Sequence, residues 1–430
     1  MSIAELYQKF KASNGISTDT RKINEGVMFF ALKGDKFNAN SFAQEALSKG
    51  AKYVVIDEAE YAIDEHCILV GDVLYTLQKL ANYHRQQLNI PFVGMTGSNG
   101  KTTSKELVAT VLSKKFKTYY TKGNLNNHIG VPLTLLGIDE SYEIAVVEMG
   151  ANHQGEIRDL CTICEPTHGF ITNVGKAHLE GFGGVEGVKK GKGELYDFLA
   201  KSGGTVFVSA KSKALIEMAA QRTFKETLYY LTDDEIVMLQ DSPVVTFSAN
   251  GSQYETHLPG SYNFENIVTA LAIGKYFGVS PELANEAVSE YNPDNNRSQI
   301  VEKGTNSILL DAYNANPSSM SASIQNFINL KTDKQKVVIL GDMFELGDSS
   351  ASEHAALGQL IAPLGFEKVL LVGSHMQHAL VHLPSAYYFP DKFGLHTWLQ
   401  DHPITDSFLL VKGSRGIQLE SVLAFLENSK

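Results

Sequence analysis

Short apolar runs alternate with helix-length segments along almost the whole chain, and this alternation limits the folds open to it. Tyr53–Ile56, Ile144–Glu148 and Thr205–Ser209 are runs of four or five residues, rich in Val. That length and composition are typical of buried strands. Further strands are predicted at 27–32, 68–70, 92–95, 170–173, 308–311, 337–340, 369–372 and 408–411, and helices at 41–49, 73–88 and 101–115. Strands separated by helices predict parallel sheets built from βαβ units, so the expected fold class is α/β.

The chain has 430 residues, which predicts about three domains at roughly 100–200 residues per domain. Two turn-rich segments, 87–91 and 291–296, contain Pro together with Asn or Asp and are typical of connections. They divide the chain into an N-terminal domain at 1–88, a central domain at 89–297 and a C-terminal domain at 298–430.

Composition excludes several classes of protein. Lys and Arg number 37 against 48 Asp and Glu, a formal net charge of −11, so we expect no general binding to nucleic acid. We expect no membrane span, because no apolar run approaches about 20 residues. The three cysteines are too few for a disulfide framework, and no signal-peptide pattern opens the chain. A cytoplasmic protein is expected. The Cys161 and Cys164 pair is interpreted as packed thiols, with redox or metal chemistry as the alternative.

A predicted strand at 92–95 runs into a glycine-rich loop and then into a predicted helix, with T-G-S-N-G-K-T at 96–102. Small residues let backbone N–H groups approach a phosphate, and a helix N-terminus favours negative charge. The strict P-loop pattern would need Gly where Met95 stands, and a plain tight turn is the alternative. The loop residues assigned to the nucleotide are Gly97, Ser98, Asn99, Gly100, Lys101, Thr102 and Thr103.

Two further strand ends carry side chains that suit a nucleotide site. Glu148 ends one strand and His178 follows another, and ligands of parallel sheets bind at such ends. We interpret both as candidate metal ligands, against an exposed acid and a structural histidine as the alternatives. Lys189, Lys190 and Lys192 follow, either as a solvated basic face or as groups that neutralise phosphate.

These motifs together resemble the Mur ligase family of ATP-dependent amide ligases. The resemblance spans nearly the whole chain, and it rests on the phosphate loop and on motifs at 18–21, 29–35, 126–134, 148–156, 311–317, 340–347 and 411–416. It implies an N-terminal UDP-binding α/β domain, a central P-loop ATPase with a parallel sheet, and a C-terminal Rossmann-like domain for the amino substrate. The motif D-A-Y-N-A-N-P at 311–317 favours the member of the family that adds a dipeptide.

The implied reaction joins D-alanyl-D-alanine to UDP-N-acetylmuramoyl-tripeptide, through an acyl phosphate, in peptidoglycan precursor synthesis. ATP and two Mg²⁺ ions are the implied cofactors, and the protein is expected to be a monomer. Another ligase of the family, adding a single amino acid, is the nearest alternative. A P-loop kinase is an alternative from a different class.

The resemblance also assigns residue roles. It implies Lys101, His178, Lys192 and Arg297 as catalytic residues, with Lys192 carbamylated. The metal ligands would be Thr102, Glu148, His178 and Lys192, and the nucleotide would also meet Asn266, Arg297 and Asp311. The candidate substrate contacts are Thr20, Arg21, Lys33, Asn127, Asn152, Asn314, Asn316, Lys412 and Arg415.

Overall fold

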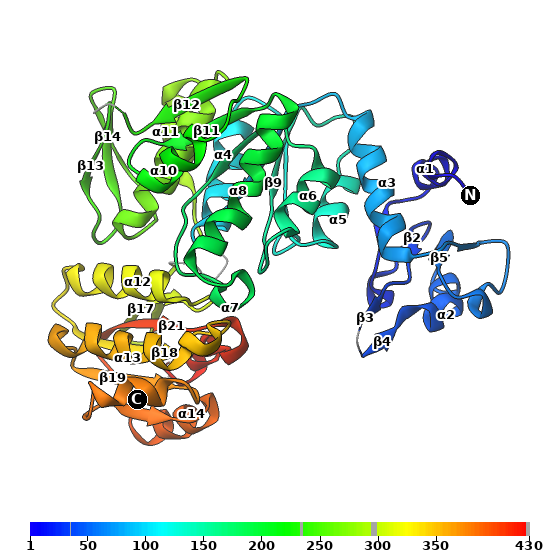
Figure 1. Cartoon of the computed structure of the whole chain (residues 1–430). Helices are drawn as coiled ribbons and strands as arrows, with labels where there is room; N and C mark the ends of the chain where they lie inside the picture. Colours follow the sequence, from blue (N-terminus) through cyan, green and yellow to red (C-terminus); the bar gives the residue numbers. More distant parts are fainter. Residues whose placement is uncertain (35, 233–234, 294–298, 427–430) are drawn as a thin grey trace.

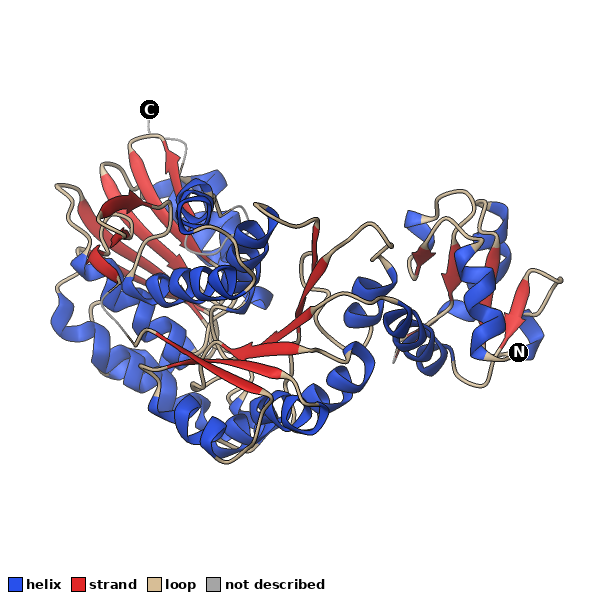
Figure 2. Ribbon diagram, turned by 90° about the horizontal axis from the view of Figure 1, so that it is seen from above, coloured by secondary structure: helices blue, strands red, loops and turns tan. Residues whose placement is uncertain are grey.

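Three α/β units follow one another along the chain in the computed structural model, as the alternation of strands and helices predicts (Figure 1). The structure describes residues 1–34, 36–232, 235–293 and 299–426. The N-terminal and C-terminal units lie on either side of the central one, and the view from above shows the strands flanked by helices (Figure 2). The α/β class is therefore confirmed, whereas the boundaries at 88 and 297 stay predictions.

The N-terminal unit is built on a four-stranded parallel sheet in the order β1-β2-β5-β6. Its strands are β1 (Ile16–Ser17), β2 (Met28–Phe30), β5 (Tyr53–Ile56) and β6 (Cys67–Leu69), with a hairpin of β3 (Lys33–Gly34) and β4 (Phe37–Asn38). Its helices are α1 (Ile3–Lys11), α2 (Ala43–Ser48) and α3 (Val73–Gln87), with 3₁₀ turns η1 (Thr20–Lys22), η2 (Ala39–Phe42) and η3 (Ala59–Tyr61).

Helix α3 connects this unit to the central one. Asp72 caps the helix, and its carboxylate accepts a hydrogen bond from the backbone N–H of Tyr75 at 2.7 Å. Near the other end the buried Arg85 donates to the carbonyl of Cys164 at 2.8 Å, and its guanidinium lies 3.8 Å from the centroid of the Phe92 ring. These contacts tie the end of α3 to the central unit.

The central unit has a six-stranded parallel sheet in the order β12-β11-β10-β7-β9-β8. Its strands are β7 (Phe92–Thr96), β8 (Thr118–Tyr120), β9 (Ile144–Glu148), β10 (His168–Ile171), β11 (Thr205–Ser209) and β12 (Glu226–Tyr230). Its helices are α4 (Lys101–Ser113), α5 (Gly130–Leu136), α6 (Glu156–Cys164), α7 (Leu179–Phe182), α8 (Val185–Ser202), α9 (Lys213–Ala220), α10 (Ser261–Tyr276) and α11 (Pro281–Glu290). Helices α4, α10 and α11 pack with one face of the sheet, and α5, α6 and α8 with the other.

The sequence patterns did not predict a three-stranded antiparallel sheet of β13 (Ile236–Gln240), β14 (Thr246–Ala249) and β15 (Ser252–Glu255). Asn250 and Gly251 join β14 to β15, and both have positive φ, at 52° and 79°. An Asn-Gly pair between short alternating segments is a strong hairpin signal, so this hairpin was predictable from the sequence.

The C-terminal unit has a six-stranded sheet in the order β16-β17-β21-β18-β19-β20. Its strands are β16 (Gln299–Lys303), β17 (Asn306–Asp311), β18 (Gln335–Gly341), β19 (Lys368–Val372), β20 (Tyr387–Phe389) and β21 (Ser407–Lys412). Its helices are α12 (Pro317–Asn329), α13 (Ser350–Ile361) and α14 (Lys392–Asp401), with 3₁₀ turns η4 (Gly347–Ser349), η5 (Ala362–Leu364), η6 (Met376–Val381), η7 (Arg415–Ile417) and η8 (Leu419–Phe425). The edge strand β16 pairs antiparallel with β17, an exception to the predicted parallel arrangement.

Two sheets direct their carboxyl ends toward one cavity. The loop after β7 and the end of β9 line it from the central unit, and the ends of β17 and β21 line it from the C-terminal unit. Strand ends of this kind are where open α/β sheets bind ligands. Among the residues that the structure describes, no helix combines the length and the apolar character needed to cross a bilayer.

Candidate active site

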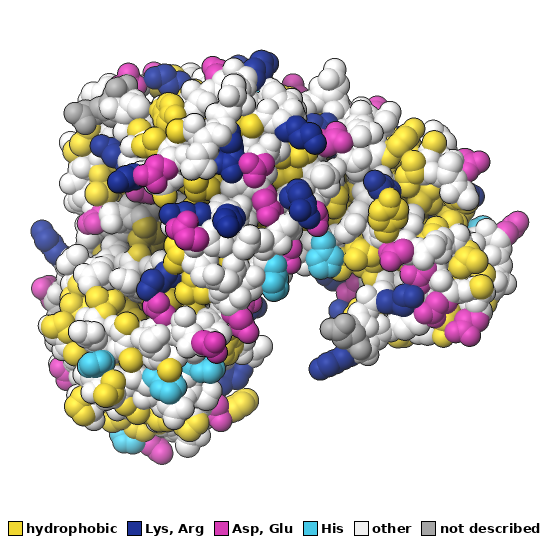
Figure 3. Space-filling view, in the orientation of Figure 1, with side chains coloured by type: hydrophobic (Ala, Val, Ile, Leu, Met, Phe, Trp, Pro, Cys, Tyr) yellow, Lys and Arg dark blue, Asp and Glu magenta, His cyan; other side chains and the backbone are white. Residues whose placement is uncertain are grey.

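A cavity of about 1110 Å³ lies where the three units meet. Helix α3 contributes Tyr75, Gln78, Lys79 and Asn82, and the C-terminal unit contributes Asp311, Tyr313, Asn314, Ser318, Ser319, Ala322, Glu345 and Lys412. The central unit supplies the remaining wall. The surface is hollowed between the N-terminal and C-terminal units, and basic and acidic side chains are interspersed on the face shown (Figure 3). Side chains from all three units therefore border one cavity.

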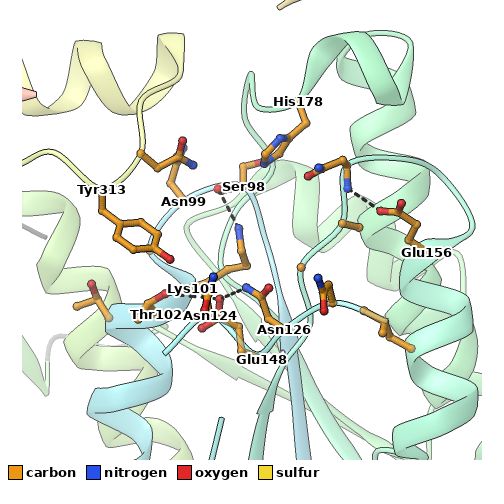
Figure 4. Close-up of a pocket in the computed structure, with 18 of the residues that line it drawn as sticks. Ser98, Asn99, Lys101, Thr102, Asn124, Asn126, Glu148, Glu156, His178 and Tyr313 are labelled. Atoms are coloured by element: carbon orange, nitrogen blue, oxygen red, sulfur yellow. Dashed lines mark hydrogen bonds between the residues drawn. The ribbon is translucent and has the colours of Figure 1, made fainter. Parts of the chain in front are cut away.

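The phosphate loop forms as the sequence predicts, between β7 and α4. Gly97 and Gly100 have φ of 152° and 75°, conformations that glycine adopts at little cost. The ammonium of Lys101 donates to the carbonyl of Gly97 at 2.7 Å and to that of Ser98 at 3.2 Å, and the second of these bonds is seen in Figure 4. The Asn99 N–H donates to the side-chain oxygen of Asn173 at 3.0 Å, which holds the loop against the end of β10.

The Glu148 carboxylate stands beside the loop and is only 1% exposed, so it is not the exposed acid of the alternative interpretation. Its Oε1 accepts a hydrogen bond from Asn126 at 2.8 Å and lies 3.5 Å from the Thr102 hydroxyl (Figure 4). Its Oε2 lies 3.8 Å from the ammonium of the fully buried Lys105. Neither Oε2 nor that ammonium has a hydrogen-bond partner among the described residues.

This oxygen-rich cluster fits a magnesium site. A buried carboxylate with one unsatisfied oxygen and a neighbouring hydroxyl are hard donors, which Mg²⁺ prefers. The described residues include no group of three or more His, Cys, Asp and Glu side chains that could hold a metal ion.

His178 borders the same cavity from the start of α7. Its Nδ1 pairs with the Glu345 carboxylate of the C-terminal unit, and this hydrogen bond lowers the pKa of that carboxyl. The imidazole is therefore engaged by a residue 167 positions further along the chain, at the boundary between two units. Glu345 carried no signal that singled it out within the motif at 340–347.

Lys192 lies behind the cavity wall and is fully buried, so it does not belong to a solvated basic face. Its ammonium donates to the carbonyl of Ala151 at 3.1 Å, and Ala151 lines the cavity. Burial lowers the pKa of Lys192 well below its ordinary value, and the charge of Lys101 lowers it further. A lysine of lowered pKa is more readily neutral, the form in which an amine reacts as a nucleophile.

A second group of amide side chains follows the loop. Asn266 on α10 accepts a hydrogen bond from Ser104 at 2.9 Å and donates to Asn263 at 3.1 Å. Both asparagines line the cavity. Across from them, Asp311 pairs with Lys412 at 2.6 Å. Asn266 and Asp311 thus both line the cavity, and their contacts with a nucleotide stay predictions.

The site residues predicted from the sequence divide into those that line the cavity and those that do not. Those that line the cavity are Ser98, Asn99, Gly100, Lys101, Thr102, Thr103, Asn127, Glu148, Asn152, His178, Asn266, Asp311, Asn314 and Lys412. Those outside its lining are Gly97, Lys192, Asn316, Arg415, Thr20, Arg21 and Lys33. Arg297 lies outside the residues that the structure describes.

Three of the outlying residues have partners of their own. Asn316 caps α12 and also donates to Asn99 of the phosphate loop at 2.8 Å, which joins two units. Arg21 pairs with its neighbour Asp19 at 2.8 Å. Lys33 pairs with Asp57 at 3.0 Å.

Sequence reasoning missed several residues that line the cavity. Asn126 and Asn173 fix Glu148 and Asn99, and both stood unassigned inside motifs that the sequence analysis quoted. The helix α3 residues and Tyr262 on α10 carry no local signal, because only the packing of the units brings them to the cavity.

A phosphate loop on a parallel sheet, a carboxylate and a hydroxyl beside it, and a further unit on each side define a multidomain nucleoside-triphosphate-dependent enzyme. Family models add the particular family: one for the Mur ligase middle domain matches residues 95–274, and one for the Mur ligase glutamate ligase domain matches 296–415. The chain belongs to the Mur ligase family.

The chain is similar to relatives along nearly its whole length. The UDP-N-acetylmuramoyl-tripeptide–D-alanyl-D-alanine ligase of Bacillus subtilis is 33% identical over 97% of this chain and 93% of that protein. The ligase of the same name from Escherichia coli is 33% identical over 97% and 94%. Among solved structures, MurF from Acinetobacter baumannii has a TM-score of 0.85 at 30% identity, covering 100% of this chain and 99% of that chain. The MurF ligase of Thermotoga maritima in complex with ADP has a TM-score of 0.82 at 26% identity and 97% coverage of each.

Proposed function

We propose that this protein is the ATP-dependent ligase that adds D-alanyl-D-alanine to UDP-N-acetylmuramoyl-tripeptide in peptidoglycan precursor synthesis. The observation that carries the proposal is similarity to ligases of that name over 97% of the chain at 33% identity. A cavity bordered by three units, with the phosphate loop on its wall, supports it. The products are the UDP-muramoyl-pentapeptide, ADP and phosphate.

The reaction begins with a carboxylate, which is a poor electrophile until it is activated. The terminal carboxylate of the tripeptide attacks the γ-phosphate of ATP, and ADP leaves as the acyl phosphate forms. Lys101 and the backbone N–H groups of the loop neutralise charge that develops on the transferring phosphoryl group. The amine of the dipeptide then attacks the acyl carbon, and phosphate leaves.

Magnesium fits this scheme through residues already described. Thr102 and Glu148 would hold one Mg²⁺, which supplies charge neutralisation at the phosphates, and Asn126 orients Glu148. His178 would hold a second ion on the side of the carboxylate substrate. Chelation of divalent cations is expected to abolish phosphate release.

Lys192 is proposed to act as a carbamate. Its buried amine of lowered pKa supports reaction with CO₂, in which nitrogen bonds to carbon and a proton leaves to solvent. The product is an anion, which suits a residue beside a cation site better than an ammonium would. We expect Lys192→Ala to lose at least about 100-fold in turnover and to regain activity with added short-chain carboxylic acids. A variant that keeps full activity without such acids would refute this role.

The nucleotide is proposed to lie between the central and C-terminal units. Asn266 would contact the adenine, and Asp311 the ribose, with Arg297 contributing from the connection between the units. The N-terminal unit would hold UDP through Thr20, Arg21 and Lys33, and Asn127 and Asn152 would face the peptide in the cavity. Asn314, Asn316, Lys412 and Arg415 are proposed for the dipeptide or the nucleotide.

Closure of the three units around the substrates would exclude water, which would otherwise hydrolyse the acyl phosphate. The proposed enzyme is a monomer of the cytoplasm. Its three free cysteines, Cys67, Cys161 and Cys164, agree with a reducing compartment.

The experiment that tests the function is amine-dependent phosphate release. The purified protein is incubated with ATP, Mg²⁺ and UDP-N-acetylmuramoyl-tripeptide, and D-alanyl-D-alanine is compared with single amino acids and glutamate. We expect phosphate release with the dipeptide, and a product heavier than the tripeptide substrate by one dipeptide less water. Release with a single amino acid alone would favour the alternative ligase, and a phosphorylated final product would favour a kinase.

A further inference from the structure

The contact between His178 and Glu345 joins the central and C-terminal units inside the cavity. His178 stands at the start of α7, and Glu345 lies in the loop after β18. The backbone N–H of Glu180 also donates to the carbonyl of Glu345, at 3.4 Å. The loop after β18 is thereby docked onto α7 by both a side chain and a main-chain contact.

Both residues of this pair hold an unfavourable backbone conformation. His178 has φ of 52° and Glu345 has φ of 61°, in the left-handed region that is uncommon for residues other than glycine. Conformations of this kind are strained and concentrate at functional sites. In these conformations the side chains of His178 and Glu345 contact each other across the boundary between the two units.

The proposed ligase reaction, on which this inference rests, needs a group that holds the incoming amine. The amino nitrogen must be placed beside the acyl carbon with its lone pair directed at it. A carboxylate that accepts hydrogen bonds from the amine does this, because bonds to charged acceptors are short and strong. Five carboxylates line the cavity: Glu148, Glu156, Asp159, Asp311 and Glu345.

Three of the five belong to the central unit, and two of these, Glu148 and Glu156, are already engaged. Glu148 is buried against Asn126 and Lys105. Glu156 accepts hydrogen bonds from the backbone N–H groups of Asn152 and His153, at 2.7 and 3.2 Å. The Oε2 of Glu148 lacks a hydrogen bond but is buried beside the Lys105 ammonium, where an incoming amine cannot reach it, and Glu156 is held by the two backbone N–H groups.

Two more are paired with basic side chains. Asp159 pairs with its neighbour Arg158 at 3.0 Å, on α6. Asp311 pairs with Lys412 at 2.6 Å. Among the described residues, Glu345 is therefore the carboxylate of the lining that has neither a lysine, an arginine nor a backbone N–H as partner. Its side chain is 50% exposed, so an incoming molecule can reach it.

We infer that Glu345 is a substrate-binding residue, whose carboxylate accepts a hydrogen bond from the amino group of the incoming dipeptide. His178 holds the carboxylate in place from the opposite unit, and docking of the C-terminal unit brings it to the reacting carbon. The amine site is thus complete only when the two units are packed together.

The test compares two nucleophiles on one variant, Glu345→Gln. With D-alanyl-D-alanine, we expect KM for the dipeptide to rise about 10- to 100-fold, the range for losing a hydrogen bond to a charged group. KM for ATP and for the UDP-muramoyl-tripeptide should stay within about twofold. Hydroxylamine at high concentration traps an acyl phosphate as a hydroxamate without needing a built amine site, so its rate should match that of the wild type.

A matched control separates amine binding from docking of the units. Glu353 pairs with Lys176 at 2.6 Å across the same boundary, and it lies outside the cavity lining. Glu353→Gln should leave both reactions within about twofold of the wild type. Glu345→Asp keeps the charge but shortens the side chain, and it should give a smaller rise in KM than Glu345→Gln.

The outcomes are distinct. An unchanged KM for the dipeptide in Glu345→Gln overturns the inference. An equal fall in the rates of ligation and of hydroxamate formation also overturns it, because Glu345 would then act in activation of the carboxylate substrate. If the wild-type protein releases no phosphate with the dipeptide but forms hydroxamate, the proposed function fails, and the inference for this amine fails with it.

Discussion

Replacement of Lys105 by Met tests whether the buried pair of Lys105 and Glu148 stabilises the fold. Lys105 is fully buried, and its ammonium lies 3.8 Å from Oε2 of Glu148 and 3.5 Å from Oε1 of Glu106, which is more exposed and stays in place in every variant below. At an effective dielectric constant of about 20, two unit charges at that distance attract by about 4 kcal/mol. Removal of one partner of a buried pair typically costs about 3–5 kcal/mol, because the other charge is left without compensation.

The measurement is unfolding of the purified variants by heat and by urea. A loss of about 4 kcal/mol in a domain of some 200 residues corresponds to a fall in Tm of about 8–16 °C. The double variant Lys105→Met with Glu148→Gln removes both charges, and we expect it to recover most of that loss. Lys114→Met is the control, because Lys114 ends the same helix and pairs with the exposed Glu290 at 2.9 Å, so it should cost less than about 1 kcal/mol.

Two results would refute this reasoning. One is a single variant Lys105→Met whose stability lies within about 1 kcal/mol of the wild type, since the pair would then contribute no net stabilisation. The other is a double variant no more stable than Lys105→Met alone. In that case the loss would come from packing of the lysine stem rather than from the charge on Glu148.

Two further predictions concern other parts of the central unit. Burial lowers the pKa of the His168 imidazole to about 4, whereas it is about 6.5 in the unfolded chain. The contribution of His168 to stability is therefore full above pH 6.5. It is lost as the pH falls toward 4, because the unfolded chain binds a proton there that the folded chain does not. The loss should be on the order of 3 kcal/mol. We expect His168→Phe to flatten the fall in the free energy of unfolding, measured with urea, between pH 7 and pH 4.5. An unchanged dependence of that free energy on pH would contradict this prediction. Gly97→Ala would place a Cβ 1.9 Å from the Thr172 hydroxyl oxygen, so we expect at least tenfold weaker ADP binding by calorimetry. Gly71→Ala, which meets no atom within 4 Å, is the control, and equal ADP affinity in the two variants would contradict the role of the loop.

Sequence reasoning succeeded where the signal is local. The phosphate loop, Glu148 at the end of β9 and the α/β class follow from neighbouring residues, because strand length, helix spacing and loop glycines act over a few positions. The signal for the hairpin at Asn250 and Gly251 is equally local, because it is an Asn-Gly pair between two short strands.

The burial of Lys105 shows where such reasoning ends. In the sequence it is one of several helix lysines, and lysine is seldom fully buried. Its position four residues after Lys101 places both on one face of α4, yet only the packing of that face against β9 puts Lys105 beside Glu148.

The sequence by itself determined the class of fold, the nucleotide loop and, through its motifs, the family. Tertiary structure alone brought side chains of helix α3 to the cavity, and it alone made the contacts of Asn316 with Asn99 and of Glu345 with His178. The physical reason is the range of the interactions. Those contacts join residues 167 and 217 positions apart, so they depend on how whole units pack, whereas strand and loop patterns are set by adjacent residues.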